Sequence, residues 1–307
     1  MIDSETTLDL ALLSPERLLL FESPDQIRSR PLWRDNLEPD AHPPVRILGG
    51  YSFGKANWWP CGMSSCRTSH GEGYVVATES GLETHIGKDC GERLFHENFS
   101  DIERTFQRQY NEQTRRDLLE GLLHAKDESL KNTIKTIRQV EANQALVVSY
   151  VSEISREPTL QKAFQDALSE GGRLIYSRKK TESELETTGR TERFVRETAG
   201  RIDGVAATRF GKLDNELKYN VLGPLHELTA ESLARASQKQ LEQKSRLVSE
   251  LRDKLREADE FSEATRRFTK SANWLAFQSL FGPDRTKTTG RGLKILARLV
   301  MQSHSET

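Results

Sequence analysis

Apolar positions in the middle of this 307-residue chain follow the spacing of an amphipathic helix. Between residues 100 and 172 they recur at steps of three and four, which places one apolar stripe along a helical surface. Pro158 should begin a new helix, because proline is tolerated in a first turn, and the Gly171-Gly172 pair should end it. The stripe consists of Leu118, Leu119, Leu122, Leu123, Leu130, Ile134, Ile137, Val140, Leu146 and Val147.

A second helical pattern begins near Leu213, breaks at Gly223-Pro224 and continues to about Phe281. Its leucines stand among Glu, Gln, Lys and Arg, which is typical of a coiled coil or a helical hairpin. The heptads are imperfect, so the sequence leaves open whether these helices fold back or pair between chains. We therefore predict a mainly α fold of long amphipathic helices, arranged as a helical bundle or coiled coil.

The remaining segments are shorter. Prolines forbid a long regular element in residues 1–47, and residues 45–48 predict a short strand that closes at Gly49-Gly50. Residues 173–212 favour a less regular connector or a β-hairpin, whose order the sequence leaves open. The predicted divisions are an irregular segment (1–47), a small α+β module (48–99), a helical region (100–172), the connector (173–212), a helical or coiled-coil region (213–282) and a basic C-terminal tail (283–307).

Composition and charge narrow the function classes. Hydrophobic residues make up 35% of the chain and charged residues 30%, a balance that suits helices with one apolar stripe. The charges of the 45 basic and 46 acidic residues nearly cancel. A charged partner would therefore have to bind to a local patch of opposite charge. No run approaches the roughly 18 apolar residues of a membrane span. We expect no membrane association and a cytoplasmic location.

The clearest chemical signal is the clustering of cysteines. All three lie between Cys61 and Cys90, within the string that begins Cys61-Gly-Met-Ser-Ser-Cys66 and reaches His70. Residues 74–78 and 83–87 predict two strands joined by a Ser80-Gly81 turn, and a helix follows Cys90. Zinc takes four sulfur or imidazole ligands in a tetrahedron, and a turn, a hairpin and a helix start can supply them from a short chain.

These residues resemble the treble-clef class of zinc fingers over about forty residues, 58–96. The knuckle corresponds to Cys61 and Cys66, the hairpin to residues 74–86, and Cys90 heads the helix. The resemblance implies a structural Zn²⁺ ion. The knuckle spacing is longer than the usual two residues, and the helix start offers one cysteine rather than two. The fourth ligand therefore stays open, with His70 the first choice, His96 the second and His85 the third.

Other interpretations of this region are weaker. Buried cysteines are common core residues, but three within thirty positions and none elsewhere favour metal. The nearby acids Glu72, Glu79, Glu83 and Asp89 show no catalytic spacing, so we expect a structural site. Some nucleases use a treble clef with a histidine on the hairpin, but their paired-histidine motif is absent. Trp58 and Trp59 suit aromatic cover of the metal site better than stacking on bases.

The leading functional hypothesis is a non-enzymatic, zinc-stabilised interaction or assembly protein. Its helices would bind a protein partner or mediate self-association, and no small-molecule substrate is apparent. The alternative is a nucleic-acid-binding protein that uses the zinc module and the basic C-terminal helix, which would weaken steeply with salt. A metal-dependent hydrolase or nuclease is the third hypothesis.

Overall fold

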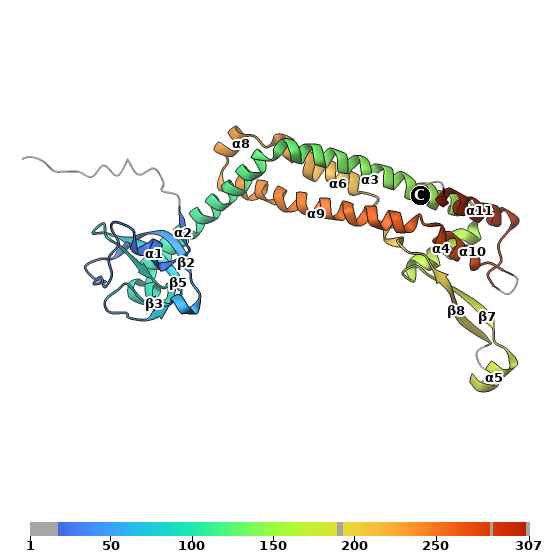
Figure 1. Ribbon diagram of the computed structural model, residues 1–307, viewed down its shortest axis with the longest axis horizontal. Helices are drawn as coiled ribbons and strands as arrows, with labels where there is room; N and C mark the ends of the chain where they lie inside the picture. Colours follow the sequence, from blue (N-terminus) through green and yellow to red (C-terminus); the bar gives the residue numbers. More distant parts are fainter. Residues whose placement is uncertain (1–17, 189–192, 283–284, 305–307) are drawn as a thin grey trace, which may run out of the picture. The chain divides into compact units, whose positions relative to one another are not determined.

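The computed structural model describes residues 18–188, 193–282 and 285–304 (Figure 1). Helices hold more than half of these residues, so the fold is mainly α, as the hydrophobic periodicity predicts. The chain forms two compact units, and each is described by itself. The first comprises Met1–Leu118 with Ser237–Leu241, and the second comprises Leu119–Ala236 with Glu242–Thr307.

The first unit is built on a four-stranded sheet with the strand order β1-β2-β5-β6. β1 pairs with β2 in parallel, and the other neighbours are antiparallel. A second, two-stranded sheet pairs β3 with β4. The elements are β1 (Leu19–Phe21), α1 (Pro24–Arg28), β2 (Pro44–Ser52), a 3₁₀ turn (Lys55–Asn57), β3 (Trp59–Pro60), β4 (Ser69–His70), β5 (Glu72–Thr78), β6 (Glu83–Ile86) and α2 (Lys88–His124).

The glycines of β2 do not end the strand, contrary to the expectation from the sequence. β2 continues through Gly49 and Gly50 to Ser52. A Cβ atom on Gly49 would lie 2.4 Å from the carbonyl oxygen of Leu19. The missing side chain thus lets β1 approach β2, which means that the glycine serves sheet packing and not chain reversal.

Both faces of the first unit's sheet are covered. The adjacent residues Val75 and Val76 of β5 point to opposite faces, and both are fully buried. Val76 belongs to a cluster with Phe99 and Phe106 of α2, which also contains Cys61 and Cys90. The cluster on the other face contains Phe21, Ile27, Leu48, Tyr51, Phe53, Trp59 and Val75.

The second unit joins its helices around one core. Its elements are α3 (Lys126–Ser155), α4 (Pro158–Ser169), β7 (Arg173–Lys179), α5 (Glu182–Thr188), β8 (Phe194–Arg201), a 3₁₀ turn (Val205–Arg209), α6 (Leu213–Glu216), a π-helical turn (Leu217–Leu222), α7 (Gly223–Glu227), α8 (Ala230–Ala234), α9 (Gln238–Phe268), α10 (Ser271–Ser279) and α11 (Gly290–His304). Trp274 of α10 lies at the centre, stacked on Tyr150 of α3 at 5.1 Å and edge-on to Phe268 at 5.1 Å.

The predicted start of α4 is confirmed. Pro158 occupies its first turn, and the carboxylate of Glu157 accepts a hydrogen bond from the Leu160 N–H at 2.8 Å. Gly171 and Gly172 follow the helix with positive φ angles, a conformation that glycine adopts readily.

The predicted break at Gly223-Pro224 is wrong. The helical path runs from α6 through the π-helical turn into α7, where Pro224 occupies the first turn. Proline donates no N–H bond, and the π-helical turn directly before α7 departs from the regular α-helical hydrogen-bonding pattern. The path ends at Leu228 instead, and the side chain of Thr229 caps α8.

Strands β7 and β8 form an antiparallel hairpin that extends away from the helices of the second unit (Figure 1). Tyr176 donates its hydroxyl hydrogen to Glu197 at 2.6 Å. Arg178 binds Glu197 at 2.7 Å and Glu184 of α5 at 2.7 Å, which ties the tip helix to the strands. No helix in the described part of the chain is long and apolar enough to cross a membrane.

Candidate metal centre

Two short strands place the first candidate ligands. Cys61 follows β3 directly, and the chain then turns and returns as β4, which ends at His70. The turn is closed by hydrogen bonds from the Cys61 N–H to the Thr68 carbonyl at 2.9 Å and from the Cys66 N–H to the Met63 carbonyl at 3.1 Å. Because His70 pairs with Trp59 in the ladder, its ring is held beside the segment that carries Cys61.

The third cysteine comes from the start of a helix. β6 ends at Ile86, and α2 begins two residues later with Cys90 in its first turn. The ligand atoms of Cys61, His70 and Cys90 all lie within 4.8 Å of one another, close enough to hold a metal ion. The Sγ atom of Cys66 lies 3.1 Å from that of Cys90. The structure thus brings together three of the four residues that the sequence suggests as ligands, and the fourth, Cys66, contacts Cys90 without belonging to that group.

The hydrogen bonding of His70 leaves one ring nitrogen available. Its Nδ1 atom lies 2.9 Å from the hydroxyl of Tyr51. Its Nε2 atom is buried and has no hydrogen-bond partner among the described residues. A buried imidazole nitrogen without a partner is costly, and a metal ion would satisfy it. Burial also lowers the pKa of His70, which favours the neutral ring that metal ions bind.

The three thiols differ in their surroundings. Cys61 and Cys90 are buried, whereas Cys66 is partly exposed, with an Nη atom of Arg93 at 2.7 Å from its sulfur. Burial raises the pKa of Cys61, and burial together with the contact to Cys66 raises the pKa of Cys90. Burial acts in the same direction on Cys66, but hydrogen bonds from Thr68 and Cys90 outweigh it and lower its pKa to about 7. Cys66 is therefore the thiol that ionises most readily.

The two other histidines that the sequence offers lie outside this cluster. His85 is fully buried, its Nε2 atom is 2.7 Å from the carbonyl oxygen of Pro60, and burial lowers its pKa to about 3. It supports the backbone that leads into Cys61. His96 is exposed and has a φ of 50°, which interrupts the helical conformation of α2. Its side chain does not belong to the cluster.

The two tryptophans that the sequence suggests as cover of the site differ in burial: Trp59 is buried, and Trp58 is half exposed. The ring of Trp59 stacks on that of His85 at 3.6 Å, and the guanidinium of Arg28 lies 4.8 Å from the Trp59 ring centre. Trp58 is half exposed, and its indole edge lies over Gly71. Trp59 is thus a packing residue behind the cysteine turn.

Three residues that support the candidate site were not predicted from the sequence: Tyr51, Gly87 and Arg93. Tyr51 directly follows the Gly49-Gly50 pair, at which the sequence predicts that the strand ends. Gly87 makes room for the His70 ring, because a Cβ atom there would lie 2.8 Å from its Cδ2 atom. No pattern in the sequence points to Tyr51 or to Gly87 as part of the site. Arg93 could have been found, because it stands three residues after Cys90 and so shares its side of the helix.

The nearby acidic residues do not join the group of Cys61, His70 and Cys90. Glu83 binds Arg30, with an N–O distance of 2.9 Å, and Glu72 accepts a hydrogen bond from Ser52 at 3.2 Å. The donor set is therefore one of sulfur and imidazole nitrogen. No family model, no characterised protein and no solved structure matches the chain.

Proposed function

We propose that the chain is a non-enzymatic interaction or assembly protein whose first unit is stabilised by a zinc ion. The observation that supports this most is the convergence of Cys61, His70 and Cys90 within 4.8 Å, with Cys66 in contact with Cys90. Thiolate and imidazole ligands select zinc over the hard cations magnesium and calcium, which prefer oxygen.

The geometry of the group suits zinc with little movement. Zinc–sulfur bonds of about 2.3 Å in a tetrahedron place two sulfur atoms roughly 3.8 Å apart. The 3.1 Å between Cys66 and Cys90 would widen slightly, and the separations of up to 4.8 Å would contract by about 1 Å. We assign Cys66 as the fourth ligand because its sulfur touches that of Cys90 and its surroundings favour the thiolate.

A site with these four ligands is structural in character. Catalytic zinc keeps an open position and a nearby general base, whereas Cys61, Cys66, His70 and Cys90 fill all four positions. The ion would join the turn after β3, strand β4 and the start of α2. Such a link stabilises a small unit whose apolar core is limited.

The second unit would supply the interaction surfaces. Several of its apolar side chains are largely exposed, among them Val148, Tyr219 and Met301. Self-association predicts a molar mass that rises with concentration above the 34.9 kDa of one chain in light scattering. A constant single-chain mass would restrict the proposal to binding of a different protein.

Metal analysis of protein purified without added metal tests the zinc assignment. The wild type should contain about one zinc per chain, and Cys90→Ser and His70→Ala should each lose it. His96→Asn is the matched control, because His96 is exposed and asparagine tolerates its positive φ. Wild-type protein without zinc, or retention of zinc in both ligand variants, would overturn the proposal.

A further inference from the structure

The outward face of α3 carries an uninterrupted line of basic and small side chains. The buried residues of this helix, among them Ile137, Val140 and Val147, define the side that faces the core of the second unit. On the opposite side, at steps of three and four, stand five exposed residues: Lys131, Lys135, Arg138, Ala142 and Ala145. The line extends for about 21 Å at 1.5 Å per residue.

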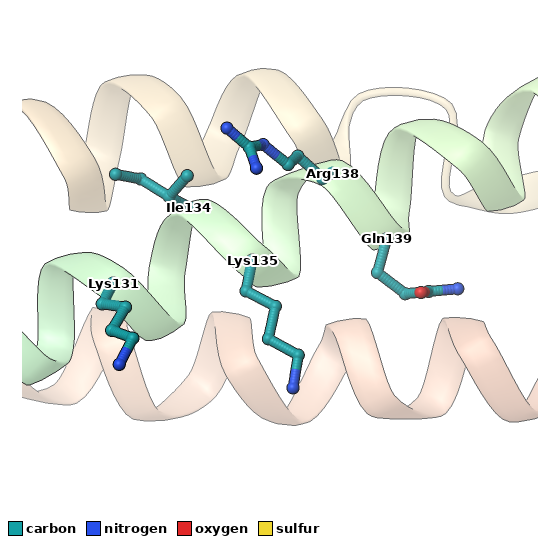
Figure 2. Close-up of a pocket in the computed structure, with 5 residues that line it drawn as sticks. All are labelled: Lys131, Ile134, Lys135, Arg138 and Gln139. Atoms are coloured by element: carbon teal, nitrogen blue, oxygen red, sulfur yellow. The ribbon is translucent and has the colours of Figure 1, made fainter.

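A shallow pocket on this face is lined by five residues of α3: Lys131, Ile134, Lys135, Arg138 and Gln139 (Figure 2). Lys131 and Lys135 extend in the same direction from the helix, whereas the side chain of Arg138 leaves it toward the other side (Figure 2). Two ammonium groups therefore lie on one side of the pocket, and the guanidinium of Arg138 adds a third cation at its other side.

These three cations are not neutralised. Within the described ranges, Lys131, Lys135 and Arg138 form no ion pair. Glu141, which borders the face, is bound to Lys218 at 2.6 Å. On helix α9, Arg246, Lys254, Arg256, Arg266 and Arg267 are each paired with a carboxylate, whereas its Lys239, Lys244 and Arg252 form no ion pair within the described ranges. The positive charge of α3 is therefore free for an external anion.

We propose that this face binds the phosphate backbone of a nucleic acid without reading its sequence. The Cα positions of the three cations follow one another at about 6 and 4.5 Å along the helix axis, and their long side chains can reach successive charges of a polyanion. The face offers one apolar anchor of moderate size, Ile134, whereas protein interfaces concentrate their affinity in large buried anchors. The two alanines let a backbone approach closely.

The surface is distinct from the contacts considered from the sequence. The basic C-terminal helix α11 buries Ile295, Leu296 and Leu299 in the core of the second unit. Its Arg298 pairs with Glu153 of α3 at 3.4 Å. The proposal does not depend on the zinc site, so the two can fail separately.

Fluorescence anisotropy with a labelled 20-base-pair duplex tests the proposal in the full-length protein. Lys131→Gln, Lys135→Gln and Arg138→Gln are combined in one variant, because glutamine keeps the helical propensity while removing the charge. The matched control replaces Arg246, Arg256 and Arg266 by glutamine, which removes three paired cations from α9. Circular dichroism and thermal unfolding check that both variants fold.

We expect the α3 variant to bind at least tenfold more weakly at 50 mM salt, and the α9 control to change less than about threefold. The slope of log K against log salt should become shallower by ~0.9 for each lost phosphate contact, or ~2.7 for the variant. Absence of duplex binding at 50 mM salt, or equal losses in both variants, would overturn the proposal. Binding of poly-glutamate through α3 in place of the duplex would overturn it too, in favour of an acidic protein.

Discussion

The hydroxyl of Tyr51 lies 2.9 Å from Nδ1 of His70. This contact fixes the orientation of the imidazole, and the other nitrogen, Nε2, is buried without a hydrogen-bond partner among the described residues. Strand β2 carries the tyrosine and strand β4 the histidine, so the main sheet of the first unit positions a residue of the smaller sheet. The candidate metal centre is therefore supported by the core beneath it.

Replacement of Tyr51 by phenylalanine should weaken zinc binding while preserving the ligands. Loss of a hydrogen-bonding partner of a ligating histidine reduces metal affinity by ~10- to 100-fold. Competition with a chromogenic chelator measures that affinity. Tyr74→Phe is the control, because it removes a hydroxyl that binds Glu103 at 2.6 Å in the same unit. Equal zinc affinities of the wild type and Tyr51→Phe would show that the tyrosine does not support the site.

A methyl group at Gly87 should disturb the site without removing a ligand. The new Cβ atom would lie 2.8 Å from Cδ2 of His70. We expect Gly87→Ala to lower the unfolding free energy of the first unit by about 1–3 kcal/mol, as overpacking usually does, and to weaken zinc binding. Chemical denaturation and chelator competition give the two values. Gly54→Ala has open space around it and should behave like the wild type.

His85 should prove to be a packing residue and not a ligand. His85→Leu removes the hydrogen bond to Pro60 and the stacking on Trp59. We expect a loss of about 1–3 kcal/mol in unfolding free energy, because a buried carbonyl is left unsatisfied, with one zinc per chain retained at saturating metal. His70→Leu, the same substitution at a proposed ligand, should lose the metal. Equal metal loss in both variants would make His85 a ligand.

The tip of the β7–β8 hairpin should resist acid. The hydrogen bonds of Glu184 with Arg178 and with the backbone of Thr181 lower the pKa of its carboxyl group from 4.5 to about 2. A carboxyl group with a lowered pKa stabilises the fold above its ordinary value, and that contribution is lost as pH falls through the folded value. Carboxyl chemical shifts of Glu184, followed by NMR from pH 6 to 1.5, should show this midpoint. In Arg178→Gln the midpoint should rise; an unchanged midpoint would contradict the assignment.

The core of the second unit should depend on Trp274. This side chain is fully buried between Tyr150 and Phe268. Trp274→Ala should reduce the unfolding free energy of the second unit by about 3–5 kcal/mol, because it leaves a large cavity. Zinc content should stay at the wild-type value. Leu275→Ala, at the neighbouring half-exposed position, should cost no more than about 0.5 kcal/mol.

The sequence was sufficient for the features that depend on spacing. The periodic leucines predicted a mainly α fold, and Pro158 predicted the start of a helix. The clustered cysteines predicted a group of residues that could hold a metal ion. Two expectations about glycine and proline were wrong for a common reason. Gly49 serves a close approach of strands and Pro224 sits in a first turn, and both roles depend on tertiary neighbours that local patterns do not contain.

The choice among the histidines also required the fold. His70, His85 and His96 are comparable in the sequence, since each lies near the cysteines. Strand pairing places His70 in the cluster. His85 instead hydrogen-bonds to the carbonyl group of Pro60, and His96, where the backbone of α2 is irregular, is exposed. Tyr51 could not be found, because the residue that it supports is nineteen positions away.

The β7–β8 hairpin has a consequence for solubility. The ribbon has two strands, so each has a backbone edge without a partner strand in the described structure. Such edges attract strands of other chains and promote aggregation, and natural proteins protect them with charged residues. Arg173, Lys179, Arg196 and Arg201 stand exposed along this ribbon. Arg173 and Arg196 contact Glu170, and Arg201 contacts Asp203. Charged side chains of this kind oppose the pairing of exposed strand edges, so replacing all four by apolar residues should favour intermolecular β-sheet formation at high concentration.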